Sequence, residues 1–266
     1  MNSLILVTND DGILSPGLLA AAEAVAPFGE LLIAAPRYQQ TAMGRAFPKD
    51  DSIGIIEEFE LTVNNKTVTG YGVHGSPAQA VSHAILELTD KKPALCVSGI
   101  NYGENIGLNL MISGTLGAAF EASTYDIPAI AVSQEVVDPA LYQATEYHSV
   151  NWDVARHFTR CFAERALKEG LPPEISVLNI NIPVSATTES AIRLTTQSRQ
   201  KYFVLRKPSK RDFSQGCYLE IEPLIDTDNL EESSDIKALI LDKVVSVTPL
   251  VWSLTAKTEW GKEYGE

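Results

Sequence analysis

The chain has 266 residues, of which 45% are apolar, and a formal net charge of −13. This composition is ordinary for a globular protein with a substantial core, and the acidic balance argues against binding to a nucleic-acid polymer or to an anionic membrane surface. Three widely spaced cysteines indicate neither a disulfide framework nor a zinc cluster, and neither a signal peptide nor a membrane span is recognisable, so we expect a cytoplasmic protein.

Strand and helix signals alternate along the first 185 residues. Apolar runs predict strands at residues 4–7, 30–35, 94–97, 128–132 and 175–182, and a β-hairpin over 52–73 that turns at Asn64-Asn65. Helices are predicted from Ser15-Pro16-Gly17 to residue 25, from Ser76-Pro77 to about residue 88, and over 113–123 and 152–168. This alternation favours an α/β fold, a parallel sheet covered by helices on both faces.

The pattern changes after Pro183. Short β-rich segments at residues 191–195, 218–221 and 244–247 are separated by polar stretches. We therefore divide the chain into a core over residues 1–185 and a β-hairpin-rich extension over 186–266, which could pack on the core or exchange with a second subunit.

Polar residues follow several predicted strands at the point where each strand ends. Asp10 and Asp11 follow the first strand, Gln39-Gln40-Thr41 the second, Gly75-Ser76-Pro77 the hairpin, and Ser98-Gly99-Ile100-Asn101 the next parallel strand. Ligands of open α/β sheets bind outside the carboxyl ends of the strands, so these residues are predicted to share one crevice.

Adjacent carboxylates at the end of a buried strand are costly to hold together unless a cation binds them. Gly12 allows a sharp turn that could direct Asp10 and Asp11 toward one point. With the amide of Asn101 and the hydroxyl of Thr41 they form an all-oxygen set, which suits Mg²⁺ or Mn²⁺. Taken alone, the segment Asn9-Asp10-Asp11-Gly12 is equally typical of a plain turn.

A second candidate group begins the helix at residue 113. Ser113-Gly114-Thr115 would present hydroxyls and unpaired helix N–H groups, which bind phosphate well, and Asn105 precedes them in a glycine-flanked loop. Ser113 could instead simply cap its helix. His74 adjoins the predicted crevice and is a weaker candidate.

The stretch over residues 199–211 is basic: it contains six lysines and arginines and no acidic residue, and it includes Tyr202 and Phe203. It could attract an anionic substrate or stack a base, although a solvated hairpin is the simpler interpretation.

At this level of detail the chain resembles the SurE survival proteins, a family of metal-dependent 5′-nucleotidases. The resemblance rests on ordered motifs at residues 6–12, 16–17, 35–36, 39–41, 75–77, 97–101, 105, 113–119, 179–183 and 245–250. It implies a Rossmann-like doubly wound, mostly parallel sheet with a C-terminal extension that helps to build homodimers or homotetramers. It also implies hydrolysis of nucleoside 5′-monophosphates, with 3′-nucleotides and short polyphosphate as further substrates to consider.

The resemblance also assigns site residues. It implies a cation held by Asp10, Asp11, Thr41 and Asn101, and active-site roles for Asn105 and Ser113. Three positions depart from the family pattern. Thr41 stands where serine is usual, Arg37-Tyr38 replaces Asp-Arg, and Gln79 replaces an aspartate.

The sequence therefore predicts a metal-dependent phosphomonoesterase. Asp10, Asp11, Asn105 and Ser113 are its candidate catalytic residues, and Asn101, Asn105, Ser113, Gly114 and Thr115 would bind the phosphate of a small substrate. One alternative is an aspartyl-phosphate phosphatase, but such enzymes typically need Asp-x-Asp and a downstream lysine. Another is a nucleotide-binding module without turnover.

Overall fold

The computed structural model describes residues 3–136, 147 and 149–255. Within these residues the fold is built around a nine-stranded sheet of order β3-β4-β2-β1-β5-β6-β7-β11-β8. Its strands are β1 (Ser3–Thr8), β2 (Gly29–Pro36), β3 (Ile56–Val63), β4 (Lys66–Val73), β5 (Leu95–Tyr102), β6 (Ala129–Gln134), β7 (Val177–Ile182), β8 (Ile192–Leu194) and β11 (Val245–Leu250). The helices are α1 (Pro16–Val25), α2 (Pro77–Glu87), α3 (Gly114–Ser123) and α4 (Asp153–Glu169), with short helices η1 (Ala26–Phe28), η2 (Gly107–Ile112), η4 (Thr227–Asn229) and η5 (Lys237–Leu241).

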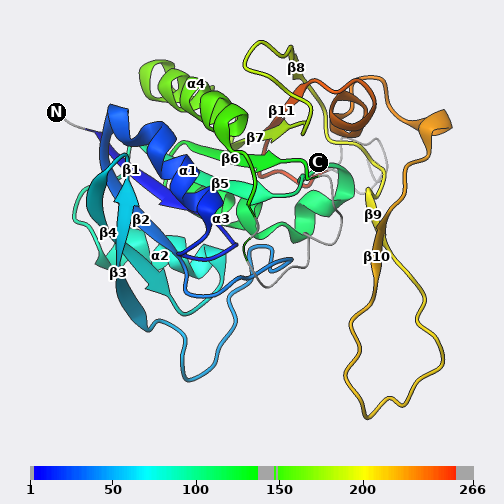
Figure 1. Cartoon of the computed structure of the whole chain (residues 1–266), viewed down its shortest axis with the longest axis horizontal. Coiled ribbons are helices and arrows are strands. Elements are labelled where there is room, and N and C mark those ends of the chain that lie inside the picture. The colour runs from blue at the N-terminus through cyan, green and yellow to red at the C-terminus, as the bar shows by residue number, and fades with distance from the viewer. Residues whose placement is uncertain (1–2, 137–146, 148, 256–266) are drawn as a thin grey trace, which may run out of the picture.

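The six central strands, from β4 to β7, pair in parallel, and two helices cover each face of the sheet (Figure 1). Side chains of β1 alternate between the two faces. Ile5 and Val7 belong to the apolar cluster that includes α1 and α4, whereas Leu4 and Leu6 belong to the one that includes α2 and α3. This confirms the predicted doubly wound, Rossmann-like α/β architecture.

Local signals in the sequence act as predicted at several element boundaries, but Ser15, expected to cap α1, makes no side-chain cap hydrogen bond. Pro16 and Pro77 occupy the first turns of α1 and α2, and Ser76 caps α2 through the backbone N–H of Gln79. Asn64 and Asn65 both adopt positive φ in the turn between β3 and β4, the conformation that a tight hairpin requires.

Strand β5 runs past its predicted end to Tyr102 and is irregular between Ser98 and Asn101. Gly99 adopts a φ of 131°, and a Cβ atom there would lie 2.3 Å from the carbonyl oxygen of Val132. Only glycine fits such a close approach, so Gly99 permits this irregularity just before Asn101.

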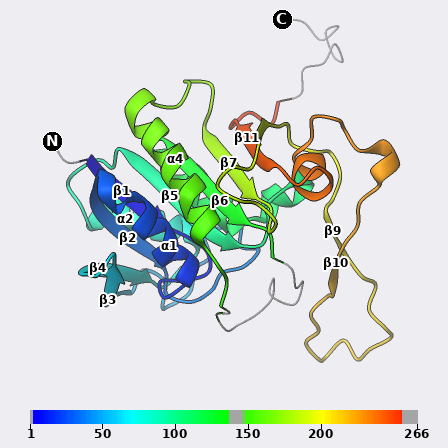
Figure 2. The ribbon, with the colours of Figure 1, turned by 45° about the horizontal axis from the view of Figure 1, so that its top comes forward.

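The C-terminal segments differ from the predicted appended hairpins, because two of them continue the core sheet. Strand β11 pairs antiparallel with β7 and parallel with β8. The buried hydroxyl of Thr195, directly after β8, bonds the hydroxyls of Ser246 and Thr248 on β11, at 2.9 and 2.8 Å. Only β9 (Phe203–Leu205) and β10 (Ile221–Pro223) form a separate ribbon, which projects from the body (Figures 1 and 2).

None of the helices in the described part of the chain has both the length and the apolar character needed to cross a bilayer.

Candidate functional site

A pocket of about 770 Å³ opens at the carboxyl ends of the central strands. Six of the predicted site residues line it: Asp10, Asp11, Thr41, Asn101, Asn105 and Ser113. They come from three regions far apart in the chain, residues 10–11, residue 41 and residues 101–113. The doubly wound topology therefore brings together the polar clusters that the sequence places after separate strands.

The two aspartates lie just beyond the end of β1, and both are buried. Asn9 folds the turn by accepting a hydrogen bond from the N–H of Gly12 at 3.1 Å. The segment is thus a turn built by Asn and Gly, as the simpler interpretation of the sequence held, and it also directs both carboxylates into the pocket.

Each carboxylate receives specific hydrogen bonds. The hydroxyl of Thr115 donates to Oδ1 of Asp10 at 2.7 Å, and the N–H of Tyr102 lies 3.4 Å from Oδ2 of Asp11. The side chain of Gln39 lies close enough to Asp11 to lower its pKa. Gln39 was not among the predicted site residues, although it belongs to the segment Gln39-Gln40-Thr41 that was expected to face the crevice.

Burial nevertheless dominates the electrostatics of the pair. It raises the pKa of Asp10 from 3.8 to about 6, against the hydrogen bond from Thr115. It also raises the pKa of Asp11 well above its usual value, and the neighbouring charge of Asp10 adds to that shift. Two buried carboxylates that destabilise one another's charged form are a setting in which a bound cation is favourable.

The remaining donors fit a hard divalent cation. Asn101 uses its amide nitrogen on the carbonyl oxygens of Tyr102 and Gly103, at 3.1 and 2.7 Å, which leaves its amide oxygen for the pocket. Among the described residues no group of three or more His, Cys, Asp or Glu could hold a metal, so a cation here would need amide and hydroxyl oxygens as well. That donor set suits Mg²⁺ or Mn²⁺.

Thr41 lies in the loop after β2 and is exposed at the rim of the pocket. The loop is tied to η2 by the N–H of Gly44, which donates to the carbonyl of Ile112 at 2.9 Å. It is tied to α3 by Arg45, whose Nε lies 2.7 Å from the buried carboxylate of Glu121. These ties hold the Thr41 segment beside the aspartates.

Helix α3 begins at the floor of the pocket. Ser113 caps the helix, because its Oγ accepts a hydrogen bond from the N–H of Leu116 at 3.2 Å, and it also lines the pocket. A Cβ atom on Gly114 would lie 2.7 Å from the Cβ of Asp10, so glycine permits this close approach. Thr115 is fully buried behind the pocket wall, where its hydroxyl serves Asp10.

Asn105 is held by residues that sequence reasoning did not single out for a role. Its amide nitrogen donates to Ser133 at 2.9 Å, and its main chain bonds the side chains of Asn179 and Asn181 on β7. Two asparagines at alternate positions of an otherwise apolar strand were the available signal, because such residues need buried partners.

Part of the pocket wall is mainly apolar. It is formed by residues of η2 and of the β9–β10 ribbon, among them Leu108, Ile112, Phe203, Leu205, Leu219 and Ile221, with Lys201 at its edge. Asn109 attaches the ribbon to η2, because its Oδ1 accepts the N–H groups of Tyr202 and Phe203, both at 2.9 Å. The start of the basic stretch is therefore part of the pocket.

The positions that depart from the family pattern lie outside the pocket lining, apart from Thr41. Gln79 accepts a hydrogen bond from the N–H of Ser76 and donates to the carbonyl of Pro48, so it completes the cap of α2. Arg37 pairs with Glu57 at 2.8 Å and lies over the ring of Tyr38. His74 bonds the same glutamate at 2.7 Å and does not line the pocket.

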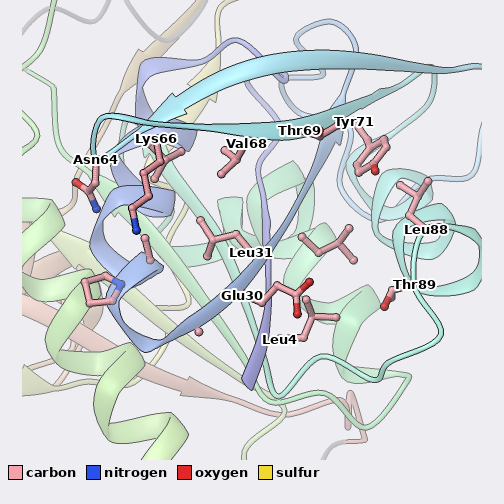
Figure 3. A pocket seen from close by; sticks show the side chains of 15 residues that line it. Leu4, Glu30, Leu31, Asn64, Lys66, Val68, Thr69, Tyr71, Leu88 and Thr89 are labelled. Carbon is pink, nitrogen blue, oxygen red and sulfur yellow. The ribbon is translucent and has the colours of Figure 1, made fainter. Parts of the chain in front are cut away.

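A second hollow, of about 610 Å³, lies where β2 and β4 diverge, at the other end of these strands (Figure 3). Leu4, Leu31 and Val68 give it apolar walls, and Glu30 and Lys66 are its charged residues. None of the predicted site residues lines it.

Comparison with known proteins gives a consistent result. The family model described as "Survival protein SurE" matches residues 5–204. The chain is 36% identical over 258 residues to the 5′-nucleotidase SurE of Methanocella arvoryzae, covering 96% of this chain and 94% of the relative. It is 38% identical over 264 residues to that of Methanothrix thermoacetophila, covering 97% and 96%. The crystal structure of the SurE protein from Aquifex aeolicus superposes with a TM-score of 0.72 at 28% identity, covering 95% and 94% of the two chains.

Proposed function

Because this chain belongs to the SurE family, we propose that it is a metal-dependent 5′-nucleotidase that hydrolyses nucleoside monophosphates to nucleoside and phosphate. The relatives named 5′-nucleotidase SurE align over nearly the whole chain, which supports the activity. The observation that carries the proposal is the buried pair Asp10 and Asp11 in a pocket whose other polar groups suit a cation and a phosphate.

In this proposal Asp10, Asp11, Asn101 and Thr41 hold Mg²⁺ or Mn²⁺. When bound, such an ion supplies Lewis-acid stabilisation of charge on the phosphoryl oxygens. Thr115 keeps Asp10 oriented through its hydroxyl. One of the two aspartates accepts a proton from the attacking water.

The phosphate would lie at the start of α3. Ser113 already accepts a hydrogen bond from Leu116, so its own hydroxyl proton remains for a phosphate oxygen. The positive end of the α3 dipole would add to this attraction, while the N–H groups of Gly114 and Thr115 lie close enough to the carboxylate of Asp10 to lower its pKa.

The nucleoside would lie against the apolar wall. Any of the nucleobases can stack on an aromatic ring, and Phe203 supplies such a ring in the pocket that Lys201 also lines. A pocket of about 770 Å³ is within the range that holds ligands of nucleotide size. This shape supports nucleotides over small phosphate monoesters.

We also propose that the protein forms a homo-oligomer through the β9–β10 ribbon. Phe213 and Tyr218, on the long connection between these strands, are 89% and 98% exposed, and Leu224 just beyond β10 is 59% exposed. Apolar side chains on a projecting segment are typical of a surface that a second subunit covers.

A phosphate-release assay tests the activity. The substrates are 5′-AMP, 5′-GMP, 3′-AMP, ribose 5-phosphate and tripolyphosphate, each with Mg²⁺, with Mn²⁺ or with EDTA. We expect release from the 5′-nucleotides with metal and none with EDTA. Asp10→Asn should lower the rate by more than about 100-fold while circular dichroism stays unchanged.

Three outcomes would contradict the proposal. Phosphate release that EDTA does not reduce, or full activity of the Asp10→Asn variant, would show that the reaction does not depend on a cation bound by Asp10. Binding of AMP without any release under saturating Mn²⁺ would favour a nucleotide-binding module instead.

A further inference from the structure

The main chain of Asn105 is held on both of its polar groups by side chains of β7. Its N–H donates to Oδ1 of Asn181 at 2.8 Å, and its carbonyl accepts from Nδ2 of the same residue at 3.0 Å. Asn179 donates a second hydrogen bond to that carbonyl, at 2.9 Å. Two donors satisfy both lone pairs of the carbonyl oxygen, so the main chain of Asn105 is held in one position against β7.

The two asparagines are placed for this contact by the strand itself. They are two residues apart and therefore point to the same face of β7. Both are fully buried, and Asn181 pairs in register with Ser133 of β6, which bonds the side chain of Asn105. Buried amides of this kind are costly unless they are hydrogen-bonded, so the contacts of Asn179 Nδ2 and of both polar atoms of the Asn181 amide stabilise the arrangement.

The hydrogen-bond directions also fix which end of the Asn105 amide faces the pocket. The hydroxyl of Thr115 gives its only proton to Asp10, so toward Asn105 it can only accept. The contact of 3.4 Å between Asn105 and Thr115 must then come from Nδ2, which also donates to Ser133. The amide oxygen of Asn105 is left for the pocket that the residue lines.

We infer that Asn179 and Asn181 are positioning residues for the hydrolysis, and that they fix Asn105 so that its amide oxygen helps to orient the attacking water. Thr115 bonds both Oδ1 of Asp10 and Nδ2 of Asn105, so these two side chains are neighbours in the pocket lining, and each offers an acceptor oxygen to the pocket. A water molecule has two protons, and donating both to these acceptors would turn a lone pair toward phosphorus.

This inference rests on the proposed function. The water oxygen forms a bond to phosphorus, and the bond from phosphorus to the ester oxygen breaks with its electron pair on that oxygen. One water proton passes to a carboxylate of the aspartate pair, and the departing oxygen takes up a proton from solvent.

The test is a set of steady-state measurements with 5′-AMP and Mn²⁺. Asn181→Asp keeps the size of the side chain but sets a second acceptor against the carbonyl of Asn105. We expect kcat to fall by about 10- to 100-fold, as for other residues that orient groups in contact with the substrate, with KM within about threefold. Thr195→Val is the matched control, because it removes a buried hydroxyl beside β11 that does not touch Asn105, and it should keep kcat.

A double-mutant cycle separates positioning from general damage to the fold. In an Asn105→Ala background the amide oxygen is gone, so adding Asn181→Asp should cost less than about threefold more in kcat. An equal loss in both backgrounds, or wild-type kcat in Asn181→Asp, would overturn the inference. If Asn181→Asp fails to fold, Asn181→Ser is used with the same expectations.

These experiments distinguish a failure of the proposed function from a failure of the positioning role alone. A wild-type protein that releases no phosphate from any nucleotide would overturn that function, and this inference with it. An active wild type with an unaffected Asn181→Asp variant would overturn the positioning role alone.

Discussion

In the proposed function, the carboxyl groups of Asp10 and Asp11 carry the central part of the chemistry. Both are buried, and without a cation their charged forms are unfavourable, which raises both pKa values. Because the pKa of Asp10 is higher in the folded chain than in the unfolded chain, the folded form binds its proton more tightly. Stability from this group is therefore present below about pH 4 and is lost as the pH rises through about 6.

Asp10→Asn provides the corresponding measurement, because asparagine does not ionise. In EDTA, we expect the unfolding free energy of this variant to improve relative to wild type as the pH rises from 4 to 7. The gain should be on the order of 3 kcal/mol, the equivalent of raising a pKa from 3.8 to about 6. Mn²⁺ should reduce the difference at pH 7 by stabilising the wild type. A difference between the two proteins that stays constant with pH would contradict this account of the pair.

At the residue scale, the sequence predicted the groups that line the pocket better than those that hold them. Asp10, Asp11, Asn101 and Ser113 each follow a strand or begin a helix, so their local positions pointed to the crevice. The partners of Thr115 and Asn105 could not be predicted, because they lie on other elements and depend on how the sheet packs. Thr115, expected to touch phosphate, is instead buried against Asp10.

Among the elements, the β9–β10 ribbon has the most testable consequence. Replacing the exposed side chains of Phe213 and Leu224 by serine should weaken the proposed contact between subunits. We expect light scattering coupled to size-exclusion chromatography to show the mass of one chain, 28.9 kDa, for this variant, and a multiple of it for the wild type.

Leu86→Ser is a suitable control, because Leu86 is 67% exposed on α2, away from the ribbon. It should leave the mass of the wild-type assembly unchanged. A wild-type protein that is a single chain at micromolar concentration would rule out the proposed assembly, and an unchanged mass in the serine variant would rule out the ribbon as its contact.

Elements with local signals were predicted well. Proline at the first turn of α1 and α2 and paired asparagines in the hairpin turn act over a few residues, so their effect is visible in the sequence. The place of β11 beside β7 was not predictable in this way. Its partner is more than 60 residues away, and the pairing depends on the edge that the completed parallel sheet presents. The short helix η2 was also missed, because it has no clear periodicity.

For the whole molecule, topology explains why one site forms at all. The central strands are parallel, so their carboxyl ends meet at one edge, and the segments after β1, β2 and β5 come together there with the start of α3. The chain carries a net charge of −13, which would repel an anionic phosphate ester. A cation between the aspartates would reverse that field where the substrate binds.

The most direct test of this account is an anomalous difference map from crystals grown with Mn²⁺. We predict a strong peak about 2.0–2.5 Å from a carboxylate oxygen of Asp10 and of Asp11, with the amide oxygen of Asn101 in the same coordination sphere. A map of an active protein with no manganese between these two aspartates would contradict it.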